Sequence, residues 1–360
     1  YFLSPIDSED SVYFHEYRKN PFTLLKVFER SFYSPEGFIK ARRIAKKTNP
    51  DVAYVLHFLN KMSPSIIDGF KSVRVPVVVR LSDFGLICPQ ALCLGGEDIC
   101  EKCLSGSLLN SVFHKCIKNS YMGSFVKAVS WYFHRMIGSI SRIDAFVSPS
   151  KFLAEKFIEV GFPREKFFHI PTFVESSQVE TTYTNKGDIL YFGRISKEKG
   201  THILLKAYDE IRTEKPTLRV IGDITSSEYS IGLVKKYSDH VKFEDFMPQK
   251  SLFERIKEAS FIVVPSICYD NMPNVILESF VHGKPVVAAS IGSFPELIDD
   301  RITGLLFDAG SVEDLTEKLM WAIDHQDEVK EMGKNARKYV EDNHSPKIHY
   351  DKLMNVFSSV

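Results

Sequence analysis

The sequence predicts an α/β protein built from two Rossmann-like, doubly wound domains that face each other across a cleft. Three observations lead to this prediction. A length of 360 residues exceeds what one ordinary core fills. In the second half, short apolar runs alternate with amphipathic stretches, which is typical of βαβ units on a parallel sheet. The hydrophobic and charged fractions, 44% and 26%, are those of a globular chain.

The second half gives the regular part of this pattern, and we expect a domain over residues 174–344. Apolar runs predict strands at 188–192, 218–221, 241–243, 261–265 and 285–289. Amphipathic stretches predict helices at 201–212, 250–259, 275–282 and 312–324. The polar segment 174–187 is the expected linker.

The first half, residues 1–173, is less regular but has the same character. Its expected strands are 53–57, 75–81 and 145–147, and its expected helices are 38–47, 65–71, 125–137 and 152–159. A cysteine-rich insertion occupies residues 88–116. We expect the last helix, within residues 345–360, to pack back on this first domain.

The start of the chain departs from the usual layout of such a domain. It is polar and has no glycine before Gly37, so the strand and glycine-rich turn that normally open the fold are not evident. Either the first βα units are missing from this sequence, or the first domain is shortened. The start also lacks the layout of a signal peptide, and the apolar runs are too short to span a bilayer, so we expect a cytoplasmic protein.

Charge composition argues against nucleic acid as the main partner. Lysine and arginine total 46, aspartate and glutamate total 46, and the net charge is zero. A nucleic-acid-binding domain is usually strongly basic. A local basic site that faces a phosphate remains compatible with this balance.

The segment 193–200 (Gly-Arg-Ile-Ser-Lys-Glu-Lys-Gly) is the first candidate site. It follows an expected strand and precedes an expected helix, so it lies at the carboxyl edge of the sheet, where open α/β sheets bind ligands. The guanidinium of Arg194 and the ammonium of Lys199 suit a diphosphate. The alternating charges are equally compatible with a solvated loop.

The segment 266–278 is the second candidate and lies at the same edge. Pro273 suits the first position of a helix, which leaves the N–H groups of Asn274 and Val275 near a free helix N-terminus. Asp270 and Glu278 supply carboxylates that can accept hydrogen bonds from sugar hydroxyls. Alternatively, such acidic residues only complement the helix dipole.

Taken together, residues 188 to about 307 resemble the donor domain of the family 4 retaining glycosyltransferases (glycosyl transferases group 1), which have the GT-B architecture. The resemblance rests on Gly-Arg-x4-Lys-Gly at 193–200, Ile-Gly-Asp at 221–223, the run 265–283, the segment 285–296 and Thr-Gly-Leu-Leu at 303–306. The family's Glu-x7-Glu element is present as Asp270-x7-Glu278, so aspartate replaces the usual first glutamate.

The resemblance implies a role for each matched residue. Arg194 and Lys199 would hold the donor diphosphate, Glu278 the ribose, and Asp270 the transferred sugar. The remaining donor-binding positions implied are Gly193, Gly222, Met247, Met272, Pro273, Asn274 and Val275, with the base near residues 246–248.

The activity implied is retaining transfer of a sugar from a UDP- or GDP-linked donor to a saccharide or lipid-linked saccharide, without a catalytic metal or other cofactor. Two alternatives remain open: a nucleotide-sugar epimerase of the same architecture, and a non-catalytic protein that binds nucleotide sugars. An NAD dehydrogenase is disfavoured because no G-x-G-x-x-G follows an expected strand.

In the first half the resemblance continues over residues 75–89. There the family has a histidine before an aspartate, facing the donor sugar, and this chain has Ser82 before Asp83. Ser82 can hydrogen-bond a sugar hydroxyl but has no imidazole. His57 is near a histidine-rich strand end of the family and is equally compatible with a core position.

Two further features of the first half suggest partners. Cys88, Cys93, Cys100, Cys103 and Cys116 follow the spacing C-x4-C-x6-C-x2-C-x12-C. Four of them, or three with His114, would complete a structural zinc site; reduced thiols and a disulfide are the alternatives. The aromatic-rich helix expected at 125–137 suits contact with a membrane surface or a lipid-linked acceptor, against core packing as the alternative.

Overall fold

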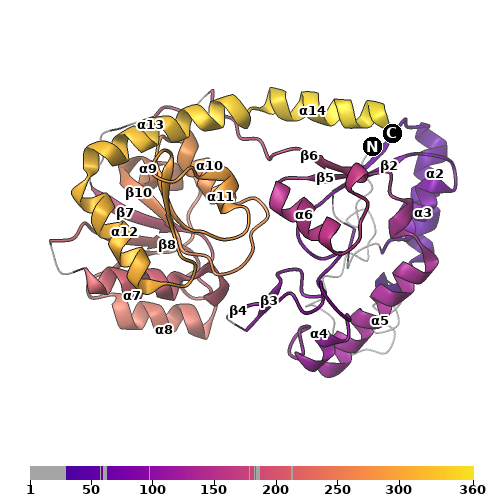
Figure 1. Cartoon of the computed structure of the whole chain (residues 1–360), viewed down its shortest axis with the longest axis horizontal. Helices are drawn as coiled ribbons and strands as arrows, with labels where there is room; N and C mark the ends of the chain where they lie inside the picture. The colour runs from indigo at the N-terminus through magenta and orange to yellow at the C-terminus, as the bar shows by residue number, and fades with distance from the viewer. Residues whose placement is uncertain are drawn as a thin grey trace.

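In the computed structural model the chain forms two α/β lobes side by side, bridged along one edge by the C-terminal helix (Figure 1). The structure describes residues 30–56, 58–59, 63–96, 98–177, 179–181, 183, 187–211 and 214–360. Among these residues, none of the helices is both long and apolar enough to cross a membrane.

The second lobe contains a six-stranded parallel sheet in the order β12-β11-β10-β7-β8-β9. Its strands are β7 (Asp188–Phe192), β8 (Leu218–Ile221), β9 (Lys242–Glu244), β10 (Ala259–Val264), β11 (Val286–Ala289) and β12 (Gly304–Phe307). The helices between and after them are α7 (Thr201–Glu210), α8 (Glu228–Tyr237), α9 (Gln249–Glu258), α10 (Asn274–Val281), α11 (Phe294–Leu297), α12 (Val312–Asp324) and α13 (Gln326–Asn343).

Side chains along β10 alternate between two buried layers because successive residues of a strand point to opposite faces. Phe261 and Val263 pack with residues of α7 and α12. Ile262 and Val264 pack with residues of α9, α10 and α13. Both faces of the sheet are therefore covered by helices, and the predicted doubly wound arrangement is confirmed.

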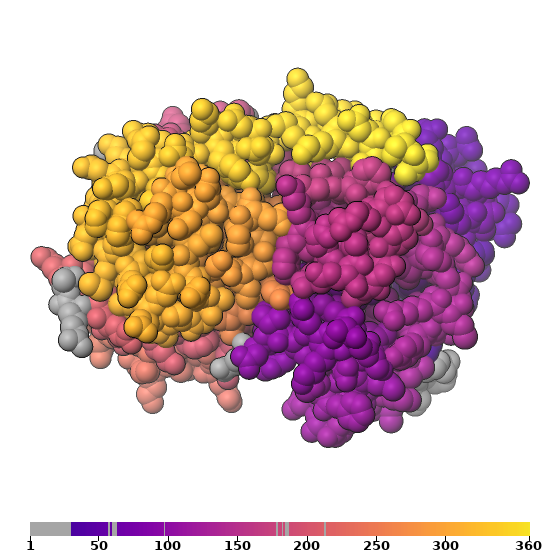
Figure 2. All heavy atoms as spheres, in the orientation of Figure 1, coloured from indigo at the N-terminus to yellow at the C-terminus, as the bar shows by residue number. Residues whose placement is uncertain are grey.

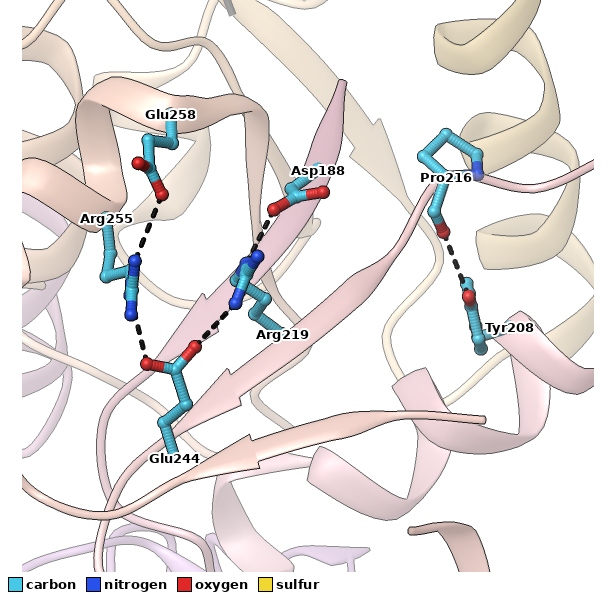
Figure 3. Close-up of polar contacts among 7 residues, drawn as sticks. All are labelled: Asp188, Tyr208, Pro216, Arg219, Glu244, Arg255 and Glu258. Atoms are coloured by element: carbon cyan, nitrogen blue, oxygen red, sulfur yellow. Dashed lines mark hydrogen bonds and ion pairs between the residues drawn. The ribbon is translucent and has the colours of Figure 1, made fainter. Parts of the chain in front are cut away.

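A chain of ion pairs connects three neighbouring strands of this sheet (Figure 3). Arg219 of β8 contacts Asp188 of β7 at 2.5 Å and Glu244 of β9 at 2.8 Å. Arg255 of α9 contacts the other oxygen of Glu244 at 2.9 Å and Glu258 at 3.2 Å. Because Asp188 and Arg219 are 11% and 16% exposed, removing one partner would leave a largely buried charge.

The first lobe contains a smaller parallel sheet in the order β1-β2-β5-β6. The strands are β1 (Ala53–Val55), β2 (Val77–Arg80), β5 (Ala145–Ser148) and β6 (Phe167–His169). The helices of this lobe are α2 (Pro35–Thr48), α3 (Ser65–Lys71), α4 (Asn110–Phe113), α5 (Tyr121–Ile137) and α6 (Lys151–Glu159). Residues 88–116 contain α4 and a two-stranded antiparallel hairpin, β3 (Leu94–Gly95) and β4 (Asp98–Ile99).

The last helix, α14 (Pro346–Ser359), follows α13 and returns to the first lobe (Figure 1). Val356 is buried against Val78 and Val147 of the first sheet, and the ring of Phe357 lies edge-on to Tyr54 at 5.3 Å. Ser345 caps the helix by accepting a hydrogen bond from the N–H of Ile348 at 3.3 Å. This helix therefore ties the end of the chain to the lobe that contains its beginning.

Element boundaries mostly lie within a few residues of the predicted ones, with three differences. Pro273 is the N-cap of α10, not its first helical residue, because its backbone is extended (ψ 108°). The helix predicted at 125–137 begins earlier, at Tyr121, where Ser120 caps it. Strands β6 and β12, the β3–β4 hairpin and helices α4, α8, α11 and α13 were not predicted.

Candidate active site

The two candidate segments lie where the strand order of the six-stranded sheet reverses. From β7 the chain continues outward to β8 and β9, and from β10 it continues outward on the other side to β11 and β12. The loops that follow β7 and β10 therefore diverge from neighbouring strands at the same edge. Such a switch point leaves a crevice at the carboxyl ends of the strands, where open α/β sheets bind ligands.

Glycines allow the loop after β7 to approach its neighbours closely. A Cβ at Gly222 would lie 2.2 Å from the carbonyl oxygen of Gly193. A Cβ at Gly200 would lie 1.8 Å from the carbonyl oxygen of Pro265, and Gly200 also has a φ of +68°. Larger residues at Gly200 and Gly222 would separate the loops, because these backbone atoms have no room to move apart without shifting the strands.

Lys199 and Asp270 are brought together by this packing. The Lys199 Nζ lies 2.8 and 2.6 Å from the two carboxylate oxygens of Asp270, and both side chains are about one-fifth exposed (21% and 23%). The loop of Asp270 is held in turn by Ser293, which donates to the Asp270 carbonyl oxygen at 2.8 Å. The two charges expected to contact different parts of a donor thus neutralise each other here.

Arg194 lies on the same loop but is far less constrained. Its side chain is 70% exposed, and its guanidinium lies 3.5 Å from Glu198. Its carbonyl oxygen accepts a hydrogen bond from the Tyr191 hydroxyl at 2.5 Å, which fixes the backbone. An exposed guanidinium on a fixed backbone is available to an anion in the crevice.

Glu278 lies in the second turn of α10 and is half-buried. Burial raises the pKa of its carboxyl group. No hydrogen bond or ion pair to its carboxylate is found within the described part of the chain. A half-buried carboxylate without a partner is an acceptor that a ligand hydroxyl can satisfy. Asn274 and Val275 begin the same helix, so their N–H groups have no acceptor within it.

The remaining predicted contacts differ in exposure. The side chain of Met272 is buried in the core beneath α10, so it would meet a ligand chiefly through its backbone. Met247 packs against the same core, whereas its neighbour Phe246 is 82% exposed. Met272 also lines an open pocket of about 460 Å³ together with Lys151, Glu296 and Lys352.

Ser82, from the first lobe, lies next to the loop of Asp270. Its carbonyl oxygen accepts a hydrogen bond from the side-chain amide of Asn271, and its own hydroxyl donates to the Leu56 carbonyl at 3.2 Å. The neighbouring Asp83 accepts from the N–H of Gly85 at 2.7 Å. The structure thus brings Ser82 to the second segment; His57 lies outside the described residues.

Several interlobe contacts around this point involve residues that the sequence did not single out. The hydroxyl of Tyr269 donates to Glu101 at 3.0 Å, and Lys156 of α6 contacts the same carboxylate at 2.9 Å. The Tyr269 ring lies edge-on to Phe152 at 4.7 Å and tilted on Phe84 at 5.9 Å. Only the adjacency of Tyr269 to Asp270 could have indicated these contacts in advance.

A second link joins the lobes at the start of α6. The carboxylate of Glu296, from α11, accepts hydrogen bonds from the N–H groups of Lys151, at 2.8 Å, and of Phe152. A carboxylate at a helix N-terminus also complements the helix dipole. Each lobe therefore contributes groups that the other lobe needs for satisfied hydrogen bonds.

The predicted zinc set is not assembled. All five cysteines are described and free, and among the described residues no three histidine, cysteine, aspartate or glutamate side chains are grouped so as to hold a metal ion. The thiols of Cys88 and Cys93 instead form a hydrogen bond with each other. This hydrogen bond lowers the pKa of Cys88 to about 6 and raises the pKa of Cys93. Both thiols are buried.

Comparison with known families accounts for the second lobe. Residues 173–339 match the family model described as glycosyl transferases group 1. This segment is a glycosyl transferases group 1 domain. The glycosyltransferase domain contains both candidate segments, whereas Ser82 and the five clustered cysteines lie outside the match.

Relatives of known sequence match over part of their length. Spore coat protein SA of Bacillus subtilis (strain 168) is 25% identical over 196 residues, which are 51% of this chain and 52% of the relative. A D-inositol 3-phosphate glycosyltransferase of Frankia alni is 36% identical over 134 residues, 33% of each chain. The chain thus spans about half the length of the first relative and a third of the second.

Solved structures extend the likeness to both lobes. Anabaena Alr3699/HepE in complex with UDP is similar over 90% of this chain and 82% of that chain, with a TM-score of 0.69 and 18% identity. A glycosyltransferase from Rickettsia africae covers 97% and 84%, with a TM-score of 0.67 and 16% identity. Together with the two parallel sheets, these matches establish the predicted GT-B fold around the glycosyltransferase domain.

Proposed function

We propose that this chain is a glycosyltransferase that moves a sugar from a UDP- or GDP-linked donor to a saccharide or lipid-linked saccharide acceptor, with retention at the anomeric carbon and without a catalytic metal. Residues 174–344 would form the donor domain, and residues 1–173 with α14 the acceptor side. The proposed location is the cytoplasm, at the inner face of a membrane.

One observation carries the proposal: two cations and two carboxylates lie on the segments that follow β7 and β10, on either side of the switch point of a glycosyl transferases group 1 domain. Arg194 and Lys199 come from the loop after β7, Asp270 from the loop after β10, and Glu278 from α10. The set matches the parts of a nucleotide sugar, since cations suit a diphosphate and carboxylates suit hydroxyls. The Anabaena relative, whose fold is shared, is known in complex with UDP and with UDP-glucose.

The Lys199–Asp270 ion pair suggests how the site discriminates between ligands. A nucleoside diphosphate draws Lys199 toward its phosphates and leaves the Asp270 carboxylate with only the Ser266 hydroxyl, at 3.4 Å, as a donor. A nucleotide sugar supplies hydroxyl donors for that carboxylate as well. In the proposed complex, hydroxyl groups of the sugar therefore replace Lys199 as hydrogen-bond donors to Asp270. The complete nucleotide sugar is then bound more tightly than the diphosphate alone.

During transfer, the bond between the anomeric carbon and the diphosphate oxygen breaks, and its electron pair stays on that oxygen. Arg194, Lys199 and the N–H groups at the start of α10 stabilise the charge that develops there. The acceptor hydroxyl bonds to the anomeric carbon from the same face. Its proton passes to the departing oxygen, which lies beside it and is the nearest base.

The first experiment is a thermal-shift screen with UDP, GDP, ADP and their common sugar conjugates. A ligand at about a hundredfold excess over its Kd stabilises the folded state by about 2.7 kcal/mol, which such a screen detects. We expect one nucleotide to stabilise the wild type and to lose that effect in Glu278→Ala. Glu331→Ala is the matched control, because Glu331 is a surface residue of α13 paired with Lys334.

Three outcomes would contradict the proposal. If no nucleotide shifted the melting temperature, the proposed donor site would be contradicted. Conversion of the nucleotide sugar into its epimer, in the absence of any acceptor, would favour the epimerase instead. Binding without turnover across an acceptor panel would favour a protein that only binds nucleotide sugars.

A further inference from the structure

Residues 102–143 form an uninterrupted segment without aspartate or glutamate. The segment holds six basic residues, Lys102, Lys115, Lys118, Lys127, Arg135 and Arg142, in a chain whose charges otherwise balance. Arg142 is engaged by Asp68, and Lys127 packs over the ring of Trp131. Lys102, Lys118 and Arg135 are exposed and Lys115 is partly so.

The same segment also exposes an unusual amount of apolar surface. Seventeen large hydrophobic side chains are exposed among the described residues, and seven of them lie in the short stretch that contains α4 and α5. These seven are Leu109, Phe113, Tyr121, Met122, Phe125, Tyr132 and Met136. Phe113 and Met136 are each 76% exposed and Met122 is 71% exposed, so these are not side chains at the margin of the core.

The exposed residues of α5 lie along one face of the helix. Met122, Phe125, Tyr132 and Met136 recur at intervals of three, seven and four residues, which places them on a single stripe. The opposite face is buried around Trp131. Helix α5 is thus apolar on both sides, and only one side is accounted for by the core of the first lobe.

Cations surround the stripe. The Lys115 ammonium lies over the ring of Tyr121, 4.5 Å from its centroid, and Lys102 lies 3.1 Å from the imidazole of His114 beside α4. Lys118 precedes the start of α5, and Arg135 lies in its last turn. Aromatic and methionine side chains bordered by cations, with no acidic residue among them, match the interface of a bilayer with anionic headgroups.

We propose that the outward face of α4 and α5 docks on the surface of a bilayer that contains anionic lipids. The apolar side chains enter the boundary between headgroups and acyl chains, while the four cations contact the headgroups. A nucleic acid would use the cations but would leave the methionine and leucine side chains in water. Charge complementarity and apolar burial together therefore select a lipid surface.

This face is directly connected to the cleft. Glu101, which accepts the hydrogen bond of Tyr269 beside Asp270, is followed by Lys102 of the docking face. Helix α4 and the adjoining part of α5 also lie at the end of the first lobe away from α14, on the same side as the β3–β4 hairpin (Figures 1 and 2). Docking would hold the cleft close to the lipid surface, which suits a lipid-linked acceptor; only this last step rests on the proposed function.

The test is flotation of the purified chain with vesicles of phosphatidylcholine alone and of phosphatidylcholine mixed with phosphatidylglycerol. We expect binding to the mixed vesicles only, weakening as salt is raised. The double variants Met122→Ser/Phe125→Ser and Lys118→Glu/Arg135→Glu should each lower the partition coefficient by about tenfold or more. Matched controls are Ile231→Ser/Ile302→Ser and Lys235→Glu/Lys330→Glu, which change exposed residues of the other lobe.

Three results would overturn the docking proposal: equal binding to both vesicle types, no loss in either α5 variant, or a wild-type dimer that the α5 variants dissociate without any lipid binding. The last would make this face an interface between copies of the chain. The salt titration of the wild type needs no variant and stays informative if a variant misfolds. Because no nucleotide is present, failure of donor binding would leave the flotation result unaffected.

Discussion

The lobe that we propose as the donor side and the lobe that we propose as the acceptor side are built in different ways. On the donor side, the candidate residues follow directly from strands of a six-stranded sheet, and close glycine contacts fix their loops. On the acceptor side, a four-stranded sheet carries the insertion 88–116. In the part of the chain that the structure describes, nine non-glycine residues have a positive φ. Five of them lie in or next to that insertion, at Ala91, Cys93, Lys115, Lys118 and Asn119.

This difference separates two tasks. Backbone geometry dictated by a regular sheet suits a ligand part common to many donors, such as a diphosphate. Irregular backbone, held by its own side chains, suits the part of the reaction that differs among relatives, such as the acceptor. If this is right, sugar transfer depends mainly on residues of the donor side. The association of the two lobes depends on the contacts between them.

The largest effect should come from the donor loop. In Lys199→Met, the transition state loses one preorganised cation, and the transfer rate should fall on the order of 10²–10³. The measurement is kcat with the donor found by the thermal-shift screen. Lys197→Met, on the same loop, is the control, and equal losses in both variants would contradict a specific role for Lys199.

A large loss of stability should come from the ion pairs behind the donor site. Arg219→Met leaves Asp188 and one oxygen of Glu244 without a partner in a largely buried position, which should cost about 2–3 kcal/mol of unfolding free energy. The measurement is thermal or urea unfolding. Lys257→Met, which breaks the exposed pair with Glu254, should cost less than about 0.5 kcal/mol. Equal costs would show that the network does not stabilise the sheet.

A smaller effect should come from the contact at the start of α6. Glu296→Gln keeps the size of the side chain but removes the charge from its hydrogen bonds to Lys151 and Phe152, worth about 1 kcal/mol. The lobes should then separate more often, and small-angle scattering should give a larger radius of gyration than for the wild type. An unchanged scattering curve would mean that α14 and the aromatic contacts suffice to hold the lobes.

The smallest effect concerns pH. Burial raises the pKa of Glu278 above its ordinary value of 4.5, so its carboxyl group takes up a proton at a higher pH than an exposed glutamate does. Ribose hydroxyls hydrogen-bond best to the ionised form, so nucleotide affinity should fall as pH is lowered toward this raised pKa, by a few-fold. The effect of Glu278 on folding stability has the opposite pH dependence. Because its pKa is raised in the folded state, ionisation of Glu278 destabilises the fold as pH rises through the same range. Glu278→Gln should make the affinity independent of pH over this window; a retained slope would assign it to another group.

The sequence predicted well where the residues after β7 and β10 lie in the fold, for a physical reason. Parallel strands that are buried on both faces consist of consecutive apolar residues, so they can be recognised in the sequence. The loops that follow them all lie at the carboxyl edge of the sheet, whatever the details of packing. Arg194, Lys199, Asp270 and Glu278 were accordingly found at that edge. What the sequence could not predict was that Lys199 and Asp270 contact each other, because their distance depends on how closely Gly200 approaches Pro265.

The acceptor side was predicted less well because its contacts span long separations in sequence. Neither the bond from Asn271 to Ser82 nor that from Tyr269 to Glu101 follows any local pattern. The cysteine spacing indicated four possible ligands, but spacing does not fix the direction of a side chain. Cys93, with a φ of 50°, is turned inward to Cys88, and the expected set is not formed.

The central claim is that the loops after β7 and β10 form one donor site in which Lys199 and Asp270 exchange partners. The measurement that tests it most directly is calorimetric titration of the selected nucleoside diphosphate, and of its sugar conjugate, into wild type, Lys199→Met and Asp270→Asn. We predict that Lys199→Met weakens both ligands. Asp270→Asn should raise the affinity for the diphosphate, because it releases Lys199. It should also reduce the difference in affinity between the sugar conjugate and the diphosphate. Unchanged affinities, or changes of the same sign in both variants for the diphosphate, would contradict the account.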